Sequence, residues 1–177
     1  DAYIRFAFLT GVSKFSQVSL FSGLNNSQDI TLDERYSAIC GYTDEDVDSV
    51  FAPELPGLDR EEIRRWYNGY NWLGTSVYNP FDLLLLFDKR KFHPYWFETG
   101  TPTYLVELLK KHHYDLHRMA HEETSADVLN SIDSTSDNPI PVIYQSGYLT
   151  IKGYDREFET YRLGFPNREV EEGFVKY

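Results

Sequence analysis

Cysteine is nearly absent from this sequence: Cys40 is the only one among 177 residues. A single thiol excludes an internal disulfide and is typical of a protein kept in a reducing compartment. The sequence also shows no signal peptide and no apolar run long enough to cross a membrane. We therefore expect a cytoplasmic protein. Cys40 stands among apolar neighbours in the run AICGY, so we expect it to be a small core residue.

Positive charge is also scarce, with 17 Lys and Arg against 28 Asp and Glu and a net charge of −11. Such a chain repels phosphate backbones, which disfavours general nucleic-acid binding unless its basic residues cluster. Eight acids and the single base Arg60 fall within positions 44–62. The last third is more balanced. Its cations include Lys152, Arg156, Arg162, Arg168 and Lys176.

Motifs for phosphate binding and for nuclease chemistry are missing. The nearest phosphate-loop candidate is GVSKFS, in which Ser13 rather than glycine precedes Lys14. A metal-dependent nuclease needs an Asp followed by Glu/Asp-x-Lys on a strand. Asp88-Lys89 and Glu107–Lys110 come nearest, and neither has a strand context. The sequence therefore predicts no catalytic residue in this chain.

Three histidines recur every four residues, at His113, His117 and His121. On a helix they would share one face, and this spacing can hold a metal ion. The HExxH motif is absent, however, because Glu122 follows the last histidine. A solvated polar face is the alternative interpretation, and we predict no metal site.

What the sequence does have is a central aromatic stretch, DREEIRRWYNGYNWLGTSVYNP, from Asp59 to Pro80. Asp59 is a good N-cap for a helix, and Gly69 is a good terminator. The aromatic residues are Trp66, Tyr67, Tyr70 and Trp72. They form either a packed helix corner, with buried rings and satisfied polar tips, or a partner-binding surface made by Tyr67, Tyr70 and Trp72. We expect Trp66 to be buried against a Phe81–Phe87 helix.

Local patterns predict the other elements. The apolar run Tyr3–Thr10 predicts a strand buried on both faces, as in a parallel sheet. Thr43 is a helix cap, and Asn79-Pro80 and Pro166-Asn167 are helix starts. The alternation in the last part predicts a β-hairpin with a turn at Gly153–Glu159. Further predictions are a helix at Thr103–His113 with Leu105, Leu108 and Leu109 on its apolar face, and a partly looped polar segment at Thr124–Asn138.

Six blocks occur in one order along the chain: FLTGVSKFSQVSLFSGLNN, EEIRRWYNGYNW, VYNPFDLLL, YWFETGTPTYLVELL, YQSGYLTIK and LGFPNREVEEGF. In this order they resemble the bacterial AAA-ATPase-like proteins abundant in Bacteroides and its relatives. The resemblance runs from about Phe8 to Phe174. In that family the ATPase region is usually followed by a PD-(D/E)XK nuclease-like domain.

The resemblance implies a piece of a longer protein, because the Walker motifs would lie before this chain and the nuclease-like domain after it. The sequence begins DAYIRF and stops at EEGFVKY, within what reads as a helix, and we expect an internal piece. Residues 1–16 would be the last strand and sensor loop of an ATPase core. Residues 17–138 would be a helical region, and 139–177 a winged-helix-like hairpin with the start of the next helix.

The expected fold is mostly α with minor β (α+β), the helical lid of an AAA-type ATPase with a winged-helix-like end. By the resemblance, Thr10 would stand at the sensor position near a γ-phosphate, with Ser13 and Lys14 in the same loop. Alternatively, Thr10 and Ser13 only satisfy backbone groups in a turn. No cofactor is expected in this chain, whereas ATP and Mg²⁺ are expected for the parent protein.

Two hypotheses of function follow. In the first, this chain is the lid or regulatory segment of a P-loop ATPase coupled to a nuclease-like domain, with an incomplete active site. Its partners would then be the ATPase core and the nuclease-like domain of the same protein, with nucleic acid a further candidate and no membrane. In the second, it is a non-enzymatic module that binds protein or nucleic acid. Basic residues gathered on the hairpin or the helix after it would favour nucleic acid, and scattered ones would favour protein.

Overall fold

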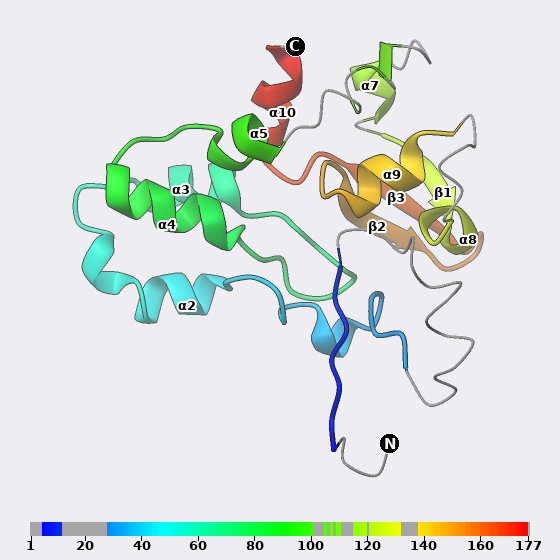
Figure 1. The fold of residues 1–177 in the computed structure, drawn as a ribbon, viewed down its shortest axis with the longest axis horizontal. Coiled ribbons are helices and arrows are strands. Elements are labelled where there is room, and N and C mark those ends of the chain that lie inside the picture. The colour runs from blue at the N-terminus through cyan, green and yellow to red at the C-terminus, as the bar shows by residue number, and fades with distance from the viewer. Residues whose placement is uncertain are drawn as a thin grey trace.

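A computed structural model describes residues 5–11, 28–100, 105, 107, 109–110, 115–119, 121–131 and 138–176. The class is α+β, as expected: helices accompany one small antiparallel sheet (Figure 1). In chain order the elements are the 3-10 helix η2 (Glu34–Tyr36), α2 (Asp44–Ser49), the 3-10 helix η3 (Ala52–Glu54), α3 (Arg60–Tyr67), α4 (Pro80–Lys89), α5 (Tyr95–Gly100), α7 (Leu116–Met119), β1 (Glu123–Ser125), α8 (Ala126–Leu129), α9 (Ile140–Gln145), β2 (Thr150–Asp155), β3 (Thr160–Gly164) and α10 (Arg168–Val175).

One hydrophobic core lies among α2, α3 and α4, which we call the helical lobe. Each helix begins at a residue that caps its free N–H groups. Thr43 and Asp46 form a reciprocal capping box on α2, Asp59 accepts from the N–H groups of Glu61 and Glu62 on α3, and Asn79 caps α4. These caps confirm the predicted helix starts. The core consists of Val47, Ile63, Trp66, Tyr67, Tyr78, Leu83, Leu86 and Phe87.

Charged groups on the surface of the helical lobe join α2 to α3. Asp44 accepts hydrogen bonds from Arg60, Arg64 and the Tyr78 hydroxyl, at 2.7, 2.6 and 2.7 Å. Burial alone would raise the pKa of Asp44, but these hydrogen bonds outweigh it and lower the pKa to about 2. The acidic run is thus partly neutralised by its own helix neighbours, and this contribution to stability is lost as the pH falls from about 4 toward 2.

A second core lies under the sheet, whose strand order is β1-β3-β2, and we call this part the sheet lobe. All strand pairs are antiparallel, and α8 and α9 accompany the sheet (Figure 1). Leu105 and Leu109 are buried in this core, in agreement with the predicted apolar face of their helix. Tyr148, Leu149, Ile151, Leu163, Val170 and Phe174 are other members.

The predicted β-hairpin is formed by β2 and β3, but its turn is shorter than expected. Gly153 is inside β2, at a register shift between Ile151 and Gly153, so the polar stretch continues the strand beyond it. The turn itself covers 156–159, where Asp155 Oδ1 accepts from the N–H groups of Glu157 and Phe158. An aspartate turn, rather than the glycine, therefore reverses the chain.

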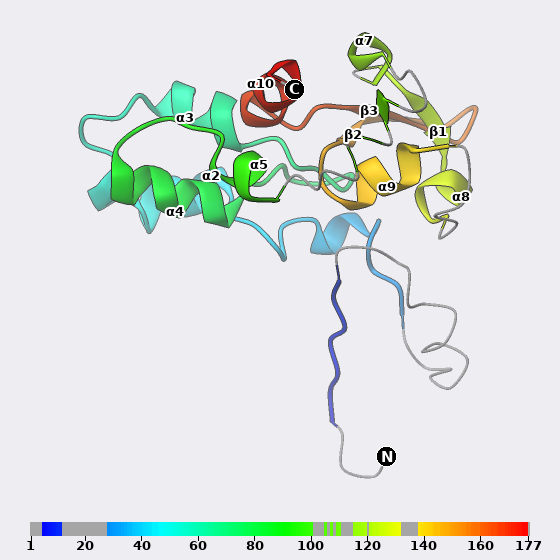
Figure 2. The same ribbon diagram turned by 45° about the horizontal axis from the view of Figure 1, so that its top comes forward.

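The two lobes meet at α5 and α10, which lie between them in both ribbon views (Figures 1 and 2). The helix α10 packs against α3 and against α5. It begins at Asn167, whose side chain accepts from Val170 N–H, as the Pro166-Asn167 start predicted. The junction is therefore built by helices that are far apart in the sequence.

The expected strand Tyr3–Thr10 is not formed over its described residues. Residues 5–11 have no regular secondary structure and extend away from both lobes (Figures 1 and 2). Phe6, Phe8 and Leu9 are 83, 46 and 58% exposed. A strand requires a neighbour for its hydrogen-bond ladder, and no described strand pairs with this segment. The segment is therefore not tucked along the helical body.

Several short elements were not predicted, and the prediction that Cys40 is a core residue was wrong. Most of β1 and all of α8 lie in the segment that was predicted to be polar and partly looped, and α5 follows Pro94 without a local helix signal. Cys40 is exposed rather than buried, because it lies in a run of turns after η2 that places Ile39 and Cys40 at the surface. In the described part of the chain, no helix has the length and apolar character that a membrane crossing needs.

Candidate functional site

The sensor-like loop predicted from the sequence is described only at its first residue. Thr10 is exposed and lies in the extended segment 5–11. Ser13 and Lys14 lie outside the described residues. The grouping of these three side chains therefore stays a prediction.

The aromatic corner is for the most part interior. Tyr67 is fully buried, and its hydroxyl donates to the carbonyl of His93 and accepts from its N–H, both at 3.0 Å. Tyr70 is buried, and its ring meets Trp96 edge-on at 6.4 Å. Trp72 is half-buried. Neither tyrosine ring is open to a partner in this conformation, and this arrangement favours the packed-corner interpretation.

Burial of Trp66 is as predicted: 7% of the residue is exposed, and it shares the helical-lobe core with Leu83, Leu86 and Phe87. Phe92 packs on its ring at 6.0 Å. The guanidinium of Arg168 lies over the ring, 5.1 Å from its centroid. A cation on the face of an indole is an attractive contact. Trp66 thus connects the helical-lobe core to α10.

The least expected feature is a pair of buried carboxyl groups, Asp82 on α4 and Glu169 on α10, each 0% exposed. Asp82 Oδ1 accepts from Trp96 N–H at 2.8 Å, and Glu169 Oε1 accepts from Phe97 N–H at 3.0 Å. Both donors belong to the first turn of α5, so side chains from two other helices cap this one. The two carboxyl groups are close enough for each to shift the pKa of the other, and Asp82 Oδ2 and Glu169 Oε2 are both buried without a hydrogen-bond partner among the described residues.

Burial is the main cause of an unusual charge state in this pair. It raises the pKa of Glu169, and the neighbouring Asp82 carboxyl group raises it further. Burial likewise raises the pKa of Asp82, while the neighbouring Glu169 carboxyl group and the hydrogen bond from Trp96 N–H act in the opposite direction. Two carboxylates in such close contact cannot both be ionised without a large Coulomb cost. The geometry therefore favours one proton held between them.

This pair was not predicted from the sequence, because both acids occur in the first turn of a helix. Acids there usually face solvent and compensate the helix dipole. A usable signal was their position in the apolar pattern. Asp82 is four residues before the buried Leu86, and Glu169 is four residues before the buried Gly173. An acid on the apolar stripe of a helix is expected to need a partner in the core.

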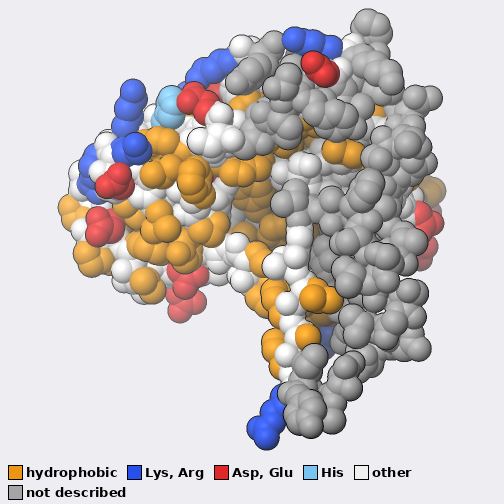
Figure 3. Space-filling model, in the orientation of Figure 1, with side chains coloured by type: hydrophobic (Ala, Val, Ile, Leu, Met, Phe, Trp, Pro, Cys, Tyr) orange, Lys and Arg blue, Asp and Glu red, His pale blue; other side chains and the backbone are white. Residues whose placement is uncertain are grey.

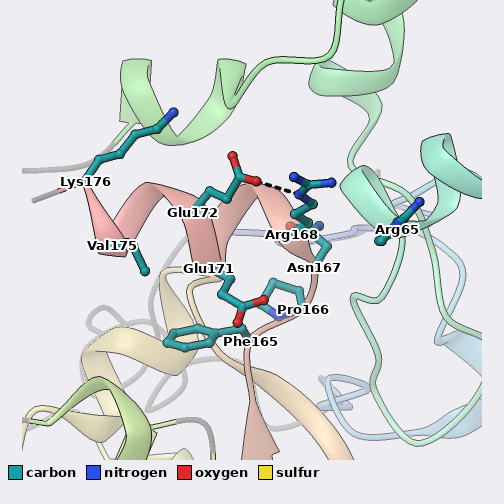
Figure 4. A pocket seen from close by; sticks show the side chains of 9 residues that line it. All are labelled: Arg65, Phe165, Pro166, Asn167, Arg168, Glu171, Glu172, Val175 and Lys176. Carbon is teal, nitrogen blue, oxygen red and sulfur yellow. Dashed lines mark hydrogen bonds and ion pairs between the residues drawn. The ribbon is translucent and has the colours of Figure 1, made fainter.

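A surface groove of about 760 Å³ lies beside this junction, between α3 and α10 (Figure 4). Arg65 comes from α3 and stands across from Arg168 on α10, and Glu171 points toward the Phe165–Pro166 corner. Arg168 pairs with Glu172 at 2.5 Å. Arg65, Phe165, Pro166, Asn167, Arg168, Glu171, Glu172, Val175 and Lys176 line the groove.

Charges in the groove are mixed. Three cations and two carboxylates line it, and one cation is already paired with a carboxylate. Arg65 and Lys176 have no ion-pair partner among the residues that the structure describes. Phe165, Pro166 and Val175 add apolar surface. A short polypeptide with acidic and apolar side chains fits this chemistry better than a phosphate backbone does, because phosphates would be repelled by Glu171.

Metal ligands are not assembled in the described part of the chain: no three His, Cys, Asp or Glu side chains there are placed to hold an ion. His113 lies outside the described residues. His121 is exposed at the end of the turn that follows α7. The prediction that these histidines form a polar face and not a metal site therefore stays a prediction.

Comparison with known proteins gave one curated relative. Over 172 residues, the chain is 58% identical to "Uncharacterized protein in vnfD 5'region" of Azotobacter chroococcum mcd 1. The match covers 96% of this chain and 33% of the relative, so the chain spans about a third of that protein's length. No protein-family model matches the chain, and no solved structure matches it. The fold class and the described sites are therefore the basis for any functional argument.

Proposed function

We propose that this chain is the lid or regulatory segment of an AAA-like P-loop ATPase coupled to a PD-(D/E)XK nuclease-like domain. The observation that carries the proposal is the exposed apolar segment 5–11. Phe6, Phe8 and Leu9 leave much of their surface in water, although they belong to a run with the pattern of a buried strand. Such a segment is suited to pair with the sheet of an ATPase core.

Two further features support this proposal. The helix α9, the β2–β3 hairpin and α10 follow one another in the chain, as in a winged-helix module. Hydrophobic side chains also gather on the face of the helical lobe that α4 presents (Figure 3), where Phe81 and Leu84 are 45 and 48% exposed. Exposed apolar groups of this kind commonly mark contacts with another domain. The longer relative has room for such domains.

The test uses calorimetry with Mg-ATP on the 177-residue chain and on the longer protein that contains it. Nucleotide binding requires a glycine-rich backbone nest, a lysine and a magnesium ligand. We expect no saturable heat from the 177-residue chain and a saturable isotherm from the longer protein. A micromolar dissociation constant for the short chain, or none for the longer one, would contradict the proposal.

A second function, protein interaction, is favoured by the groove between α3 and α10. Its cations Arg65 and Lys176 are exposed, and Phe165 adds apolar surface next to Glu171 (Figure 4). The ligand class would be an acidic segment of a partner protein with apolar side chains. Each exposed ion pair of this kind contributes only about 0.2–1 kcal/mol to the free energy of binding. Binding at this groove alone would accordingly be weak.

Fluorescence anisotropy can test this second function with a labelled peptide of alternating Glu and Leu and with a labelled DNA duplex. The double variant Arg65→Ala/Lys176→Ala should weaken peptide binding about fivefold, since two such contacts amount to about 1 kcal/mol. Arg156→Ala, an exposed cation in the hairpin turn, is the matched control and should change nothing. Equal losses in both variants, or tighter binding to DNA than to peptide, would rule out the protein-binding groove.

A further inference from the structure

We propose that Asp82 and Glu169 share one proton and act as a pH-sensitive clasp that holds α4, α5 and α10 together. Each carboxyl group is fully buried and caps the first turn of α5 through a backbone N–H. Their remaining oxygens, Asp82 Oδ2 and Glu169 Oε2, are buried without an N–H or hydroxyl donor from any other described residue. A proton between the two carboxyl groups satisfies both oxygens at once.

The surroundings of the pair offer no cation that would replace this proton. Tyr67 on α3, Tyr70 in the loop after it and Tyr95 on α5 are close enough for the charge of Asp82 to act on the pKa of each phenol. Burial first, and then the nearby carboxyl charge, raises the pKa of each of these phenols, so all three are neutral near pH 7. In the described part of the chain, no Lys or Arg contributes to the pKa of either carboxyl group.

Neighbouring charged groups on α5 and α10 are engaged elsewhere. Arg168, next to Glu169 in the sequence, lies over the Trp66 ring and pairs with Glu172 at 2.5 Å. On α5, Glu98 contacts His93 at 2.8 Å, where the histidine is more than a third exposed. The proton is therefore the only neutralising charge at the buried pair among the described residues.

The direction of the pH effect follows from the raised pKa values. Both carboxyl groups bind protons more tightly in the folded chain than in the unfolded chain, where they titrate near pH 4. The stabilising contribution of the clasp is therefore complete below about pH 4 and declines as the pH rises. Because the folded state binds one more proton than the unfolded state, the folding equilibrium constant falls about tenfold for each unit by which the pH rises. Release of this proton would leave two buried negative charges side by side and separate α10 from α4 and α5.

Glu169→Gln tests the clasp because the amide is a permanent copy of the protonated acid. Its carbonyl still accepts from Phe97 N–H, and its Nε2–H can donate to Asp82 Oδ2. The measurement is urea unfolding of the 177-residue chain between about pH 5 and about pH 9, which avoids the titration of ordinary carboxyl groups. Glu171→Gln, on the exposed side of the same helix, is the control for removing one acid.

We expect the wild-type chain and Glu171→Gln to lose stability as the pH rises, by about tenfold per unit. Glu169→Gln should remove this slope and unfold at a higher urea concentration than the wild type near pH 9. A slope in Glu169→Gln equal to that of the wild type would overturn the clasp. Asp82→Asn makes the same replacement from α4 and gives the same test if Glu169→Gln does not fold.

Infrared spectroscopy of the unmodified chain provides an independent readout. A protonated carboxylic acid has a carbonyl band distinct from that of a carboxylate, and at neutral pH we expect one such band that disappears at alkaline pH. The amides of Trp96 and Phe97 should exchange hydrogen faster over the same pH interval than the intrinsic pH dependence of exchange explains, because their acceptors separate. Absence of the band at neutral pH would show that no proton is shared and would refute the proposal.

Discussion

Replacing Trp66 with alanine should lower the free energy of unfolding by about 3–5 kcal/mol, the usual cost of emptying a large aromatic site in a core. The residue is 7% exposed and packs with Tyr67 and Phe92 at ring distances of 5.9 and 6.0 Å. Its Nε1 has no hydrogen-bond partner within the described residues, so the loss is one of packing. The substitution also removes the surface on which Arg168 rests.

Urea unfolding of Trp66→Ala would measure this loss. The control is Leu84→Ala, which removes an apolar side chain from the same lobe at a site that is 48% exposed. Substitutions at such surface sites usually change stability by about 0.5 kcal/mol. If Trp66→Ala melts at the wild-type urea concentration, the ring is free at the surface and the aromatic corner is a binding site after all.

The second large effect is expected at Gly69, where the helix α3 ends and the chain approaches the entry to α10. The backbone φ of Gly69 is 118°, which side chains with a Cβ rarely adopt. A Cβ here would lie 2.9 Å from the carbonyl carbon of Pro166 and closer still to its oxygen. Backbone strain of about 1–2 kcal/mol and overpacking of about 1–3 kcal/mol both oppose Gly69→Ala. We expect a total loss of about 3 kcal/mol or more.

Gly57 is a matched control for this prediction. Its φ of 81° is also positive, but the nearest atom to an added Cβ is the end of the Arg90 side chain, at 3.7 Å. Gly57→Ala should therefore cost only the backbone strain, about 1–2 kcal/mol. The difference between the two variants in urea unfolding measures the clash with Pro166. If both variants lose the same free energy of unfolding, the α3–α10 contact accommodates the added Cβ at no energetic cost.

Local signals predicted the helical lobe well. Asp59 and Gly69 delimit α3, and Asn79 with Pro80 starts α4, because each of these residues acts on its own helix end. The helix α5 has no such signal. Its first turn is capped by Asp82 and Glu169, which belong to other helices, so the sequence YWFETG itself shows nothing of the cap.

Long-range pairing also explains the other missed features. The strand β1 is three residues long and exists because it pairs with β3, from Glu123 opposite Arg162 to Ser125 opposite Thr160. The intrinsic β-propensity of its residues has little influence on whether so short a strand forms. The buried carboxyl pair depends on the approach of α10 to α4, which periodicity within either helix cannot reveal. Conversely, the strand expected at Tyr3–Thr10 had a suitable pattern but no described neighbour.

The cap that Glu169 places on α5 also has a consequence for the order in which the chain becomes structured. Phe97 and Glu169 are 72 residues apart, and a ribosome makes the earlier one first. Until α10 has been synthesised, the first turn of α5 lacks one acceptor and the face of Trp66 lacks Arg168. Contacts of such long separation form late and slow the overall folding rate. Nascent chains that end before α10 should therefore expose the aromatic corner to chaperones, and only completion of the last described helix would close it.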